Sequence, residues 1–126
     1  MIGLAIFAGA GIGGVARYVL GGWVQAAAGA GFPWGTLVVN VTGSMLLAFL
    51  VAFTEGTAVS PQWRAFLAIG ICGGYTTFST FSYEAVRLMQ EGQWSRAGMY
   101  VLGSVVLCLF GAALGFQAAG AVLQRR

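Results

Sequence analysis

Residues 70–82 of this 126-residue chain read GICGGYTTFSTFS, and this stretch decides how the rest of the sequence is interpreted. Gly73 and Gly74 fall near the middle of a long apolar run, where they lower helix propensity. Five hydroxyl side chains follow within seven residues (76–82), together with Phe78 and Phe81. The pattern predicts a helix that breaks at the glycine pair and continues as a polar, aromatic segment.

Charged residues are unusually few in the chain. Six basic and three acidic residues give 7% charged residues, against about 25% in an ordinary soluble domain. Hydrophobic residues make up 59% of the chain, and the mean hydropathy is +0.86. A soluble chain of 13.0 kDa with this composition would leave large apolar patches in contact with water. The composition therefore predicts an integral membrane protein.

The same composition argues against several classes of function. The chain has no His or Lys, so it offers no imidazole base, no Schiff-base amine and no lysine for a phosphate-binding loop. Three acidic residues and two cysteines are too few for a usual zinc or calcium cage. The net charge is +3, but the arginines are scattered, which does not favour a nucleic-acid partner. We predict that the protein is not an enzyme and binds no nucleic acid.

Four apolar runs are long enough to cross about 30 Å of hydrocarbon as helices. They cover residues 2–23, 34–53, 63–89 and 97–123. The four tryptophans lie at the edges of these runs, where an amphipathic ring prefers the membrane interface: Trp23, Trp34, Trp63 and Trp94. We therefore predict an all-α integral membrane protein, a single domain (1–126) of four transmembrane helices whose third helix is broken near its middle.

The arginines divide evenly between the two predicted sides of the membrane. One side carries Arg17, Arg87 and Arg96, and the other carries Arg64, Arg125 and Arg126. Orientation normally follows an excess of basic residues on one side, so this tie leaves two interpretations open. Small counts tie by chance, or the chain inserts in both directions and pairs as an antiparallel homodimer. An inverted dimer would place sites near the midplane, about a two-fold axis.

Glycine is abundant and is spaced for close helix packing. The chain holds 21 glycines, and two pairs have GxxxG spacing: Gly9 with Gly13, and Gly111 with Gly115. Such pairs let helix backbones approach each other in lipid. We interpret them as packing faces without chemistry.

Polar residues inside the apolar runs are the default functional candidates, because burying them in lipid is costly. Arg17 either extends to the headgroups or provides a fixed positive charge at a vestibule. Asn40 either joins two helices or offers amide donors to a pathway. Backbone freed at the predicted break would offer carbonyl oxygens, which suit a small cation such as Na⁺.

The last apolar run and the end of the third run carry a second set of polar residues. Tyr100, Ser104 and Cys108 lie four residues apart and share one helix face. They form either a line of donors along a pathway or a packing face of small residues. Glu84 is the only carboxylate near membrane depth, and we expect an intrahelical ion pair between it and Arg87.

Three motifs resemble those of the fluoride-exporting channel family called Fluc or CrcB. They are GGVARY at 13–18, GTLVVN at 35–40 and GGYTTFSTFS at 73–82. Their order, spacing and four-span frame match over nearly the whole chain, and the third motif is highly specific. The resemblance implies a multi-pass protein of the cell (inner) membrane that exports fluoride by passive electrodiffusion and so gives fluoride resistance.

The resemblance also implies an assembly and a set of site residues. The assembly is a dual-topology antiparallel homodimer with two fluoride pathways and one central structural Na⁺. In the implied pathway, Asn40 donates to fluoride, and the ring edges of Phe78 and Phe81 face the ion. Arg17 lies near the vestibule and Glu84 at the far end. The remaining pathway residues carry hydroxyl groups: Ser79, Thr80, and, on the last span, Tyr100 and Ser104. The backbone carbonyls of Gly73 and Thr76 would bind the Na⁺. The chain departs from a fuller pattern of the family at Cys108 and Ala112, where some related members carry Ser or Thr.

Two other classes of protein fit part of the pattern. A proton-coupled exporter of the small multidrug-resistance kind also has four short spans and dual topology, but it needs a membrane carboxylate for its cation or proton. The first run offers Arg17 and no acid, and Glu84 lies near the end of its run. A structural subunit of a larger complex would explain the glycine pairs but not the hydroxyl cluster.

Overall fold

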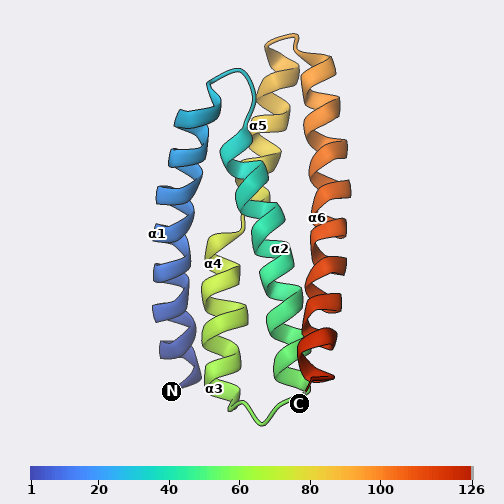
Figure 1. Ribbon diagram of the computed structural model, residues 1–126. Coiled ribbons are helices and arrows are strands. Elements are labelled where there is room, and N and C mark those ends of the chain that lie inside the picture. The colour runs from blue at the N-terminus through green and yellow to red at the C-terminus, as the bar shows by residue number, and fades with distance from the viewer. Residues whose placement is uncertain (126) are drawn as a thin grey trace.

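A computed structural model describes residues 1–125, and within that range the chain is helical with short connections. Figure 1 shows the helices running roughly parallel to one another, with the two ends of the chain at the same end of the bundle. The elements are α1 (Ile2–Ala28), α2 (Trp34–Glu55), α3 (Pro61–Arg64), the π-helix η1 (Ala65–Cys72), α4 (Gly73–Tyr75), α5 (Phe78–Gln90) and α6 (Trp94–Leu123). The prediction of an all-α fold is confirmed. Arg126, which contributed to the even arginine count, lies outside the described residues.

Three of the helices, α1, α2 and α6, are long and apolar enough to cross a membrane. The remaining rod is the third along the chain and is here called the third span (residues 61–90). It is assembled from α3, η1, α4 and α5 in succession. Five boundaries differ from the predicted ones by up to five residues. The largest differences are at α1, which continues five residues beyond Trp23, and at α6, which begins at Trp94 rather than at 97. Because Val24–Ala28 contains no helix breaker, α1 ends only at Gly29, whose φ of 93° favours glycine.

The break in the third span lies three residues after the position that the glycines indicated. Gly73 and Gly74 are helical, whereas Thr76 (φ −80°, ψ 158°) and Thr77 (φ −152°, ψ 114°) are extended. The predicted position of the break was therefore wrong, because Gly74 serves a different purpose. A Cβ at Gly74 would lie 2.8 Å from the Cα of Ala10, so this glycine lets α1 approach. The β-branched threonines, by contrast, tolerate extended backbone.

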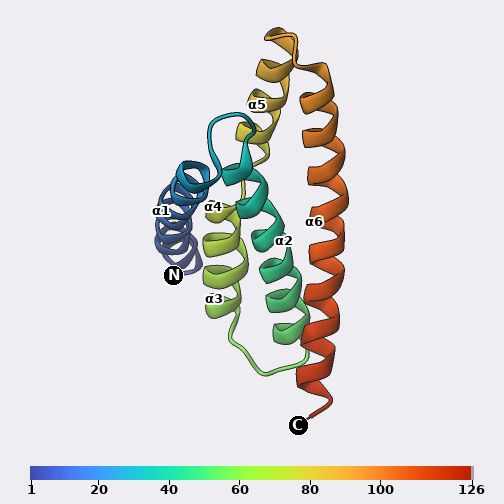
Figure 2. The ribbon, with the colours of Figure 1, turned by 45° about the horizontal axis from the view of Figure 1, so that its top comes forward.

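The break changes the neighbours of the third span. Before it, η1 and α4 pack mainly against α1, and after it α5 packs mainly against α6. Figure 2 shows this shift, with the lower half of the span beside α1 and α5 leaning toward α6. The extended residues 76–77 therefore lie where the span passes from one helix to another, close to α2.

The two GxxxG pairs form packing faces, as predicted. Gly9 and Gly13 are buried against the third span, and a Cβ at Gly9 would lie 2.9 Å from the Cα of Gly70. On α6, Gly111 and Gly115 are buried against α2. Both pairs therefore make contacts within one chain.

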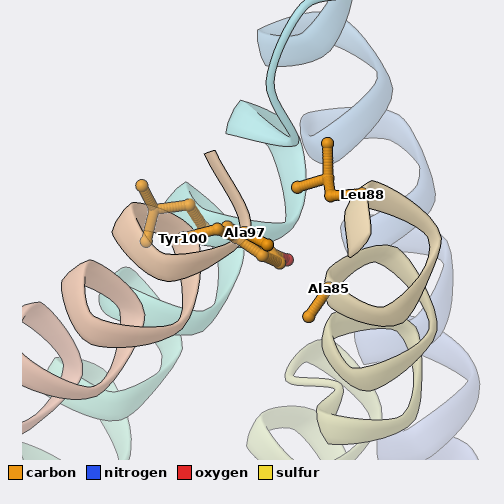
Figure 3. Packing of buried hydrophobic residues seen from close by; sticks show 5 residues of the cluster. Ala85, Leu88, Ala97 and Tyr100 are labelled. Atoms are coloured by element: carbon orange, nitrogen blue, oxygen red, sulfur yellow. The ribbon is translucent and has the colours of Figure 1, made fainter. Parts of the chain in front are cut away.

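A small core joins α5 to α6 and to the start of α2. Figure 3 shows Ala85 and Leu88 of α5 facing Ala97 and Tyr100 of α6, and Leu37 of α2 completes the buried cluster. Many large apolar side chains elsewhere point outward, including Phe7 of α1 and Phe110 of α6. An outward apolar surface of this kind suits lipid or a membrane-embedded partner.

Candidate functional site

The side chain of Asn40 holds the broken segment through both of its polar atoms. Its Oδ1 accepts from the Thr77 N–H (2.8 Å), and its Nδ2 donates to the Thr77 carbonyl (2.9 Å). Thr77 is only 8% exposed, so both backbone groups would otherwise be buried without partners. The second hydrogen of the Asn40 amide has no acceptor among the described residues, and Asn40 contributes to the lining of a cavity.

The break also frees backbone carbonyls. In a continuous α-helix the Thr77 N–H would donate to the carbonyl of Gly73, but here it donates to Asn40. The carbonyl of Thr76, at the break itself, accepts from Arg17 Nη1 at 3.2 Å. Arg17 therefore does not simply extend to the surface, since its guanidinium is fixed at the break.

A cavity of about 290 Å³, here called the aromatic cavity, lies beside the break. Its lining includes Asn40, Phe78, Phe81, Ser104 and Cys108. Ser104 is 6% exposed, and its Oγ is buried without a hydrogen-bond partner among the described residues. A buried hydroxyl without a partner costs free energy, which favours a ligand or water in this cavity.

The two predicted phenylalanines lie together at this cavity. The ring centroids of Phe78 and Phe81 are 5.5 Å apart, with an interplanar angle of 46°. The ring of Phe81 also packs against that of Tyr100, with the ring centroids 5.1 Å apart, and Phe81 is partly buried. Phe78, by contrast, is 78% exposed on the single chain. Phe81 is therefore fixed by packing, and Phe78 is left for a further contact.

The carboxylate of Glu84 is held by two hydroxyl groups. Its Oε1 accepts from Thr36 Oγ1 (2.9 Å), and its Oε2 accepts from the Tyr100 hydroxyl (2.6 Å). The expected ion pair with Arg87 is wrong, because Arg87 instead pairs with Glu91 at 2.9 Å. That pair is spaced i, i+4 on the exposed end of α5, where long side chains meet more easily.

A second cavity of about 410 Å³, here called the Arg17 cavity, connects these groups. Its lining includes Arg17, Thr77, Thr80 and Glu84. Thr77 lines both this cavity and the aromatic cavity, so the two adjoin at the break. The polar groups thus follow one another from Ser104, past the break, to Glu84.

Comparison with known proteins relates this arrangement to a family. The model of the family described as "CrcB-like protein, Camphor Resistance (CrcB)" matches residues 4–116. The chain belongs to the CrcB family. It is 49% identical over 120 residues to the "Fluoride-specific ion channel FluC" of Geobacter sulfurreducens, covering 94% of this chain and 95% of that one. It is 44% identical over 120 residues to the protein of the same name from Thermus thermophilus, covering 95% and 94%.

The structure brings most of the predicted site residues of this CrcB chain together, but not all of them. Tyr100 lines neither cavity and reaches the site through Glu84 and Phe81. Ser79 is exposed and lines neither cavity, and its hydroxyl lies 3.4 Å from Thr77 Oγ1. Its predicted place on a pathway stays a prediction.

Two residues of this candidate site were missed as individual candidates. Thr36 donates to Glu84, and Thr77 forms the break and caps α5 by accepting from the Thr80 N–H at 3.2 Å. Thr36 precedes Asn40 by four residues and so shares its helix face, which was a usable signal. Thr77 could be recognised only as one of several hydroxyls, because its partner Asn40 is 37 residues away.

Proposed function

We propose that this CrcB protein is a fluoride-selective channel that conducts F⁻ out of the cytoplasm by passive electrodiffusion and so gives fluoride resistance. The observation that carries the proposal is the aromatic cavity, whose lining brings Asn40 and Ser104, each with a donor that is unpaired among the described residues, together with Phe78 and Phe81. Close relatives over nearly the whole chain are named fluoride-specific ion channels, which supports the same function.

The groups around the cavity suit a small hard anion. Amide and hydroxyl hydrogens replace part of its hydration shell, and the electropositive edge of a phenyl ring attracts an anion weakly. Arg17 supplies a fixed positive charge at the adjoining cavity, where it attracts anions and repels cations. These contacts require no proton exchange, which supports passive movement driven by the membrane potential.

A proton-coupled exporter of the small multidrug-resistance kind receives no comparable support. It would need a carboxylate that exchanges protons or cations. Glu84 is the carboxylate that lines the Arg17 cavity, and Thr36 and Tyr100 already donate to its two oxygens.

The purified chain should pass fluoride but not chloride when reconstituted into liposomes. With a potassium ionophore to remove the charge, a fluoride electrode should record rapid efflux, and no pH gradient should be needed. Equal efflux of chloride, or efflux only under a proton gradient, would reject the channel.

We further propose that the protein works as an antiparallel, dual-topology homodimer in the cell (inner) membrane. The even split of arginines supports insertion in both directions. Phe78 is 78% exposed in the single chain, and Gly73 has open space where a Cβ would lie. A second copy covering this side would close the aromatic cavity on its exposed side.

Labelling of one introduced cysteine should reveal both orientations. We expect a cysteine at Ser95, in a chain whose Cys72 and Cys108 are replaced by Ala and Ser, to react to about half from each side of sealed vesicles. The position is suitable because Ser95 is exposed near the start of α6. Reaction from one side alone would contradict dual topology. Labelling after detergent permeabilisation measures the total amount of reactive cysteine.

A structural Na⁺ at the dimer axis is part of the same proposal. The carbonyls of Gly73 and Thr76 would bind it, two from each subunit. The Gly73 carbonyl fits this role because the break removes its usual helical donor. The Thr76 carbonyl accepts one bond from Arg17 and keeps a second lone pair. When bound, such an ion would fix the two breaks relative to each other.

A further inference from the structure

A third cavity lies at the end of the bundle that carries the α1–α2 and α5–α6 connections. This loop cavity has a volume of about 330 Å³, and Glu84, Arg87, Glu91, Arg96 and Gln25 contribute to its lining. Gln25 and Glu84 also line the Arg17 cavity, so the two cavities adjoin. The loop cavity therefore continues the line of polar groups toward the surface.

The two arginines of the loop cavity differ in their partners. Arg87 is neutralised by the carboxylate of Glu91, 2.9 Å away. Arg96 Nη1 donates to the Gly31 carbonyl (3.0 Å) and to Gln93 Oε1 (2.9 Å), which are both uncharged. Among the described residues no carboxylate pairs with Arg96. These bonds restrain its guanidinium and leave its positive charge uncompensated.

The positive charge of Arg96 lies in the same cavity as the negative charge of Glu84. The carboxylate lines both the loop cavity and the Arg17 cavity, and its hydrogen-bond donors are neutral hydroxyls. An anion that passes Glu84 is repelled, and a fixed positive charge on each side offsets that repulsion. Arg17 is such a charge in the inner cavity, held by the Thr76 carbonyl. Arg96 is its counterpart in the loop cavity.

We propose that Arg96 forms an anion-capture site at the loop end of the pathway, where it attracts fluoride and offsets the charge of Glu84. The proposal rests on the proposed channel function. It assigns to Arg96 an electrostatic role in conduction beyond its contact with the α1–α2 connection.

The test compares fluoride efflux of the parent chain, Arg96→Gln and Arg96→Lys at low and high ionic strength, with equal salt on both sides of the liposome membrane. At low ionic strength Arg96→Gln should lower the rate roughly tenfold, as loss of electrostatic steering does. The difference should vanish at about 1 M salt, where the Debye length is about 3 Å. Arg96→Lys keeps the charge and should stay close to the parent.

The matched control removes one positive charge outside the cavities. Arg125 is exposed and lines none of the three cavities, so Arg125→Gln, which changes the net charge as much as Arg96→Gln does, should conduct like the parent at both ionic strengths. In a Glu84→Gln background, Arg96→Gln should lower the efflux rate by a smaller factor than it does in the parent, because the two charges are coupled.

Three results would overturn the inference. They are an Arg96→Gln rate equal to the parent at low salt, an equal loss at low and high salt, and a loss in Arg96→Lys as large as in Arg96→Gln. The second and third would assign Arg96 to anchoring the connection. Should Arg96→Gln fail to fold, Arg96→Lys and the salt dependence of the parent decide the matter. Failure of the channel function itself is distinct, because the parent chain would then show no efflux.

Discussion

Replacing Asn40 with Asp should nearly abolish fluoride efflux. The carboxylate loses the donation from Nδ2 to the Thr77 carbonyl (2.9 Å) and points an oxygen at that carbonyl instead. Leaving a buried carbonyl without its donor costs about 1–3 kcal/mol. A negative charge within about 4 Å of a fluoride ion costs a further ~4 kcal/mol at an effective dielectric constant of 20. We therefore expect efflux to fall by at least about a hundredfold.

The control for this variant is Thr57→Val. Thr57 donates to the Phe53 carbonyl at the far end of α2 and lines none of the three cavities. Its replacement should leave the rate close to that of the parent. Size-exclusion elution of both variants in detergent separates loss of conduction from loss of fold. Efflux of Asn40→Asp at the parent rate would show that neither the hydrogen bonds of Asn40 nor a negative charge introduced at this position affects the pathway.

Replacing Gly13 with Ala should strongly destabilise the protein. An added Cβ would overlap the carbonyl oxygen of Ile71 and lie 2.8 Å from the nitrogen of Tyr75, and both are backbone atoms of a packed helix. Helix α1 would have to move away from the third span. Overpacking of this kind typically costs 1–3 kcal/mol. The Arg17–Thr76 bond lies one turn farther along α1 and should be lost as well.

Thermal unfolding in detergent measures this effect, and Gly11→Ala is the matched control. Gly11 lies on the same helix, is exposed and has no atom within 4 Å of an added Cβ. Its replacement should leave the midpoint unchanged or raise it, because Ala favours helix by up to about 1 kcal/mol over Gly. If Gly13→Ala unfolded at the same temperature as Gly11→Ala, the close approach of α1 to the third span would be refuted.

Local patterns in the sequence predicted the helices and the faces on which they pack. Apolar runs and tryptophan positions located all four rods to within a few residues. The GxxxG spacing identified Gly9, Gly13, Gly111 and Gly115 as contact positions because close packing requires residues without a side chain. It did not identify which helix each pair contacts, since that depends on the order of the rods in space.

Features that depend on partners far apart in the chain were predicted less well. The break was expected at Gly73 and Gly74 from local propensity, but Asn40 determines its position from 37 residues away. Glu84 was expected to pair with its neighbour on the same helix, yet it bonds to Thr36, 48 residues away. A local rule cannot choose between such partners, because the choice follows from how α2, α5 and α6 pack.

The broken span links the fold to the proposed function. Because η1 and α4 pack against α1 whereas α5 packs against α6, the backbone at Thr76 and Thr77 extends where the two halves of the span meet. Extended backbone exposes amide and carbonyl groups that a helix would satisfy, and Asn40 and Arg17 bind them. The same two side chains line the adjoining cavities, so the contacts that stabilise the break also place polar groups along the proposed pathway.

The reversal potential of the current in planar bilayers tests passive fluoride selectivity most directly. With fluoride and chloride gradients set in opposite directions, the current should reverse close to the equilibrium potential of fluoride. That potential should stay the same when a pH gradient is added. A reversal potential near that of chloride, or one that follows the pH gradient, would contradict a fluoride-selective channel.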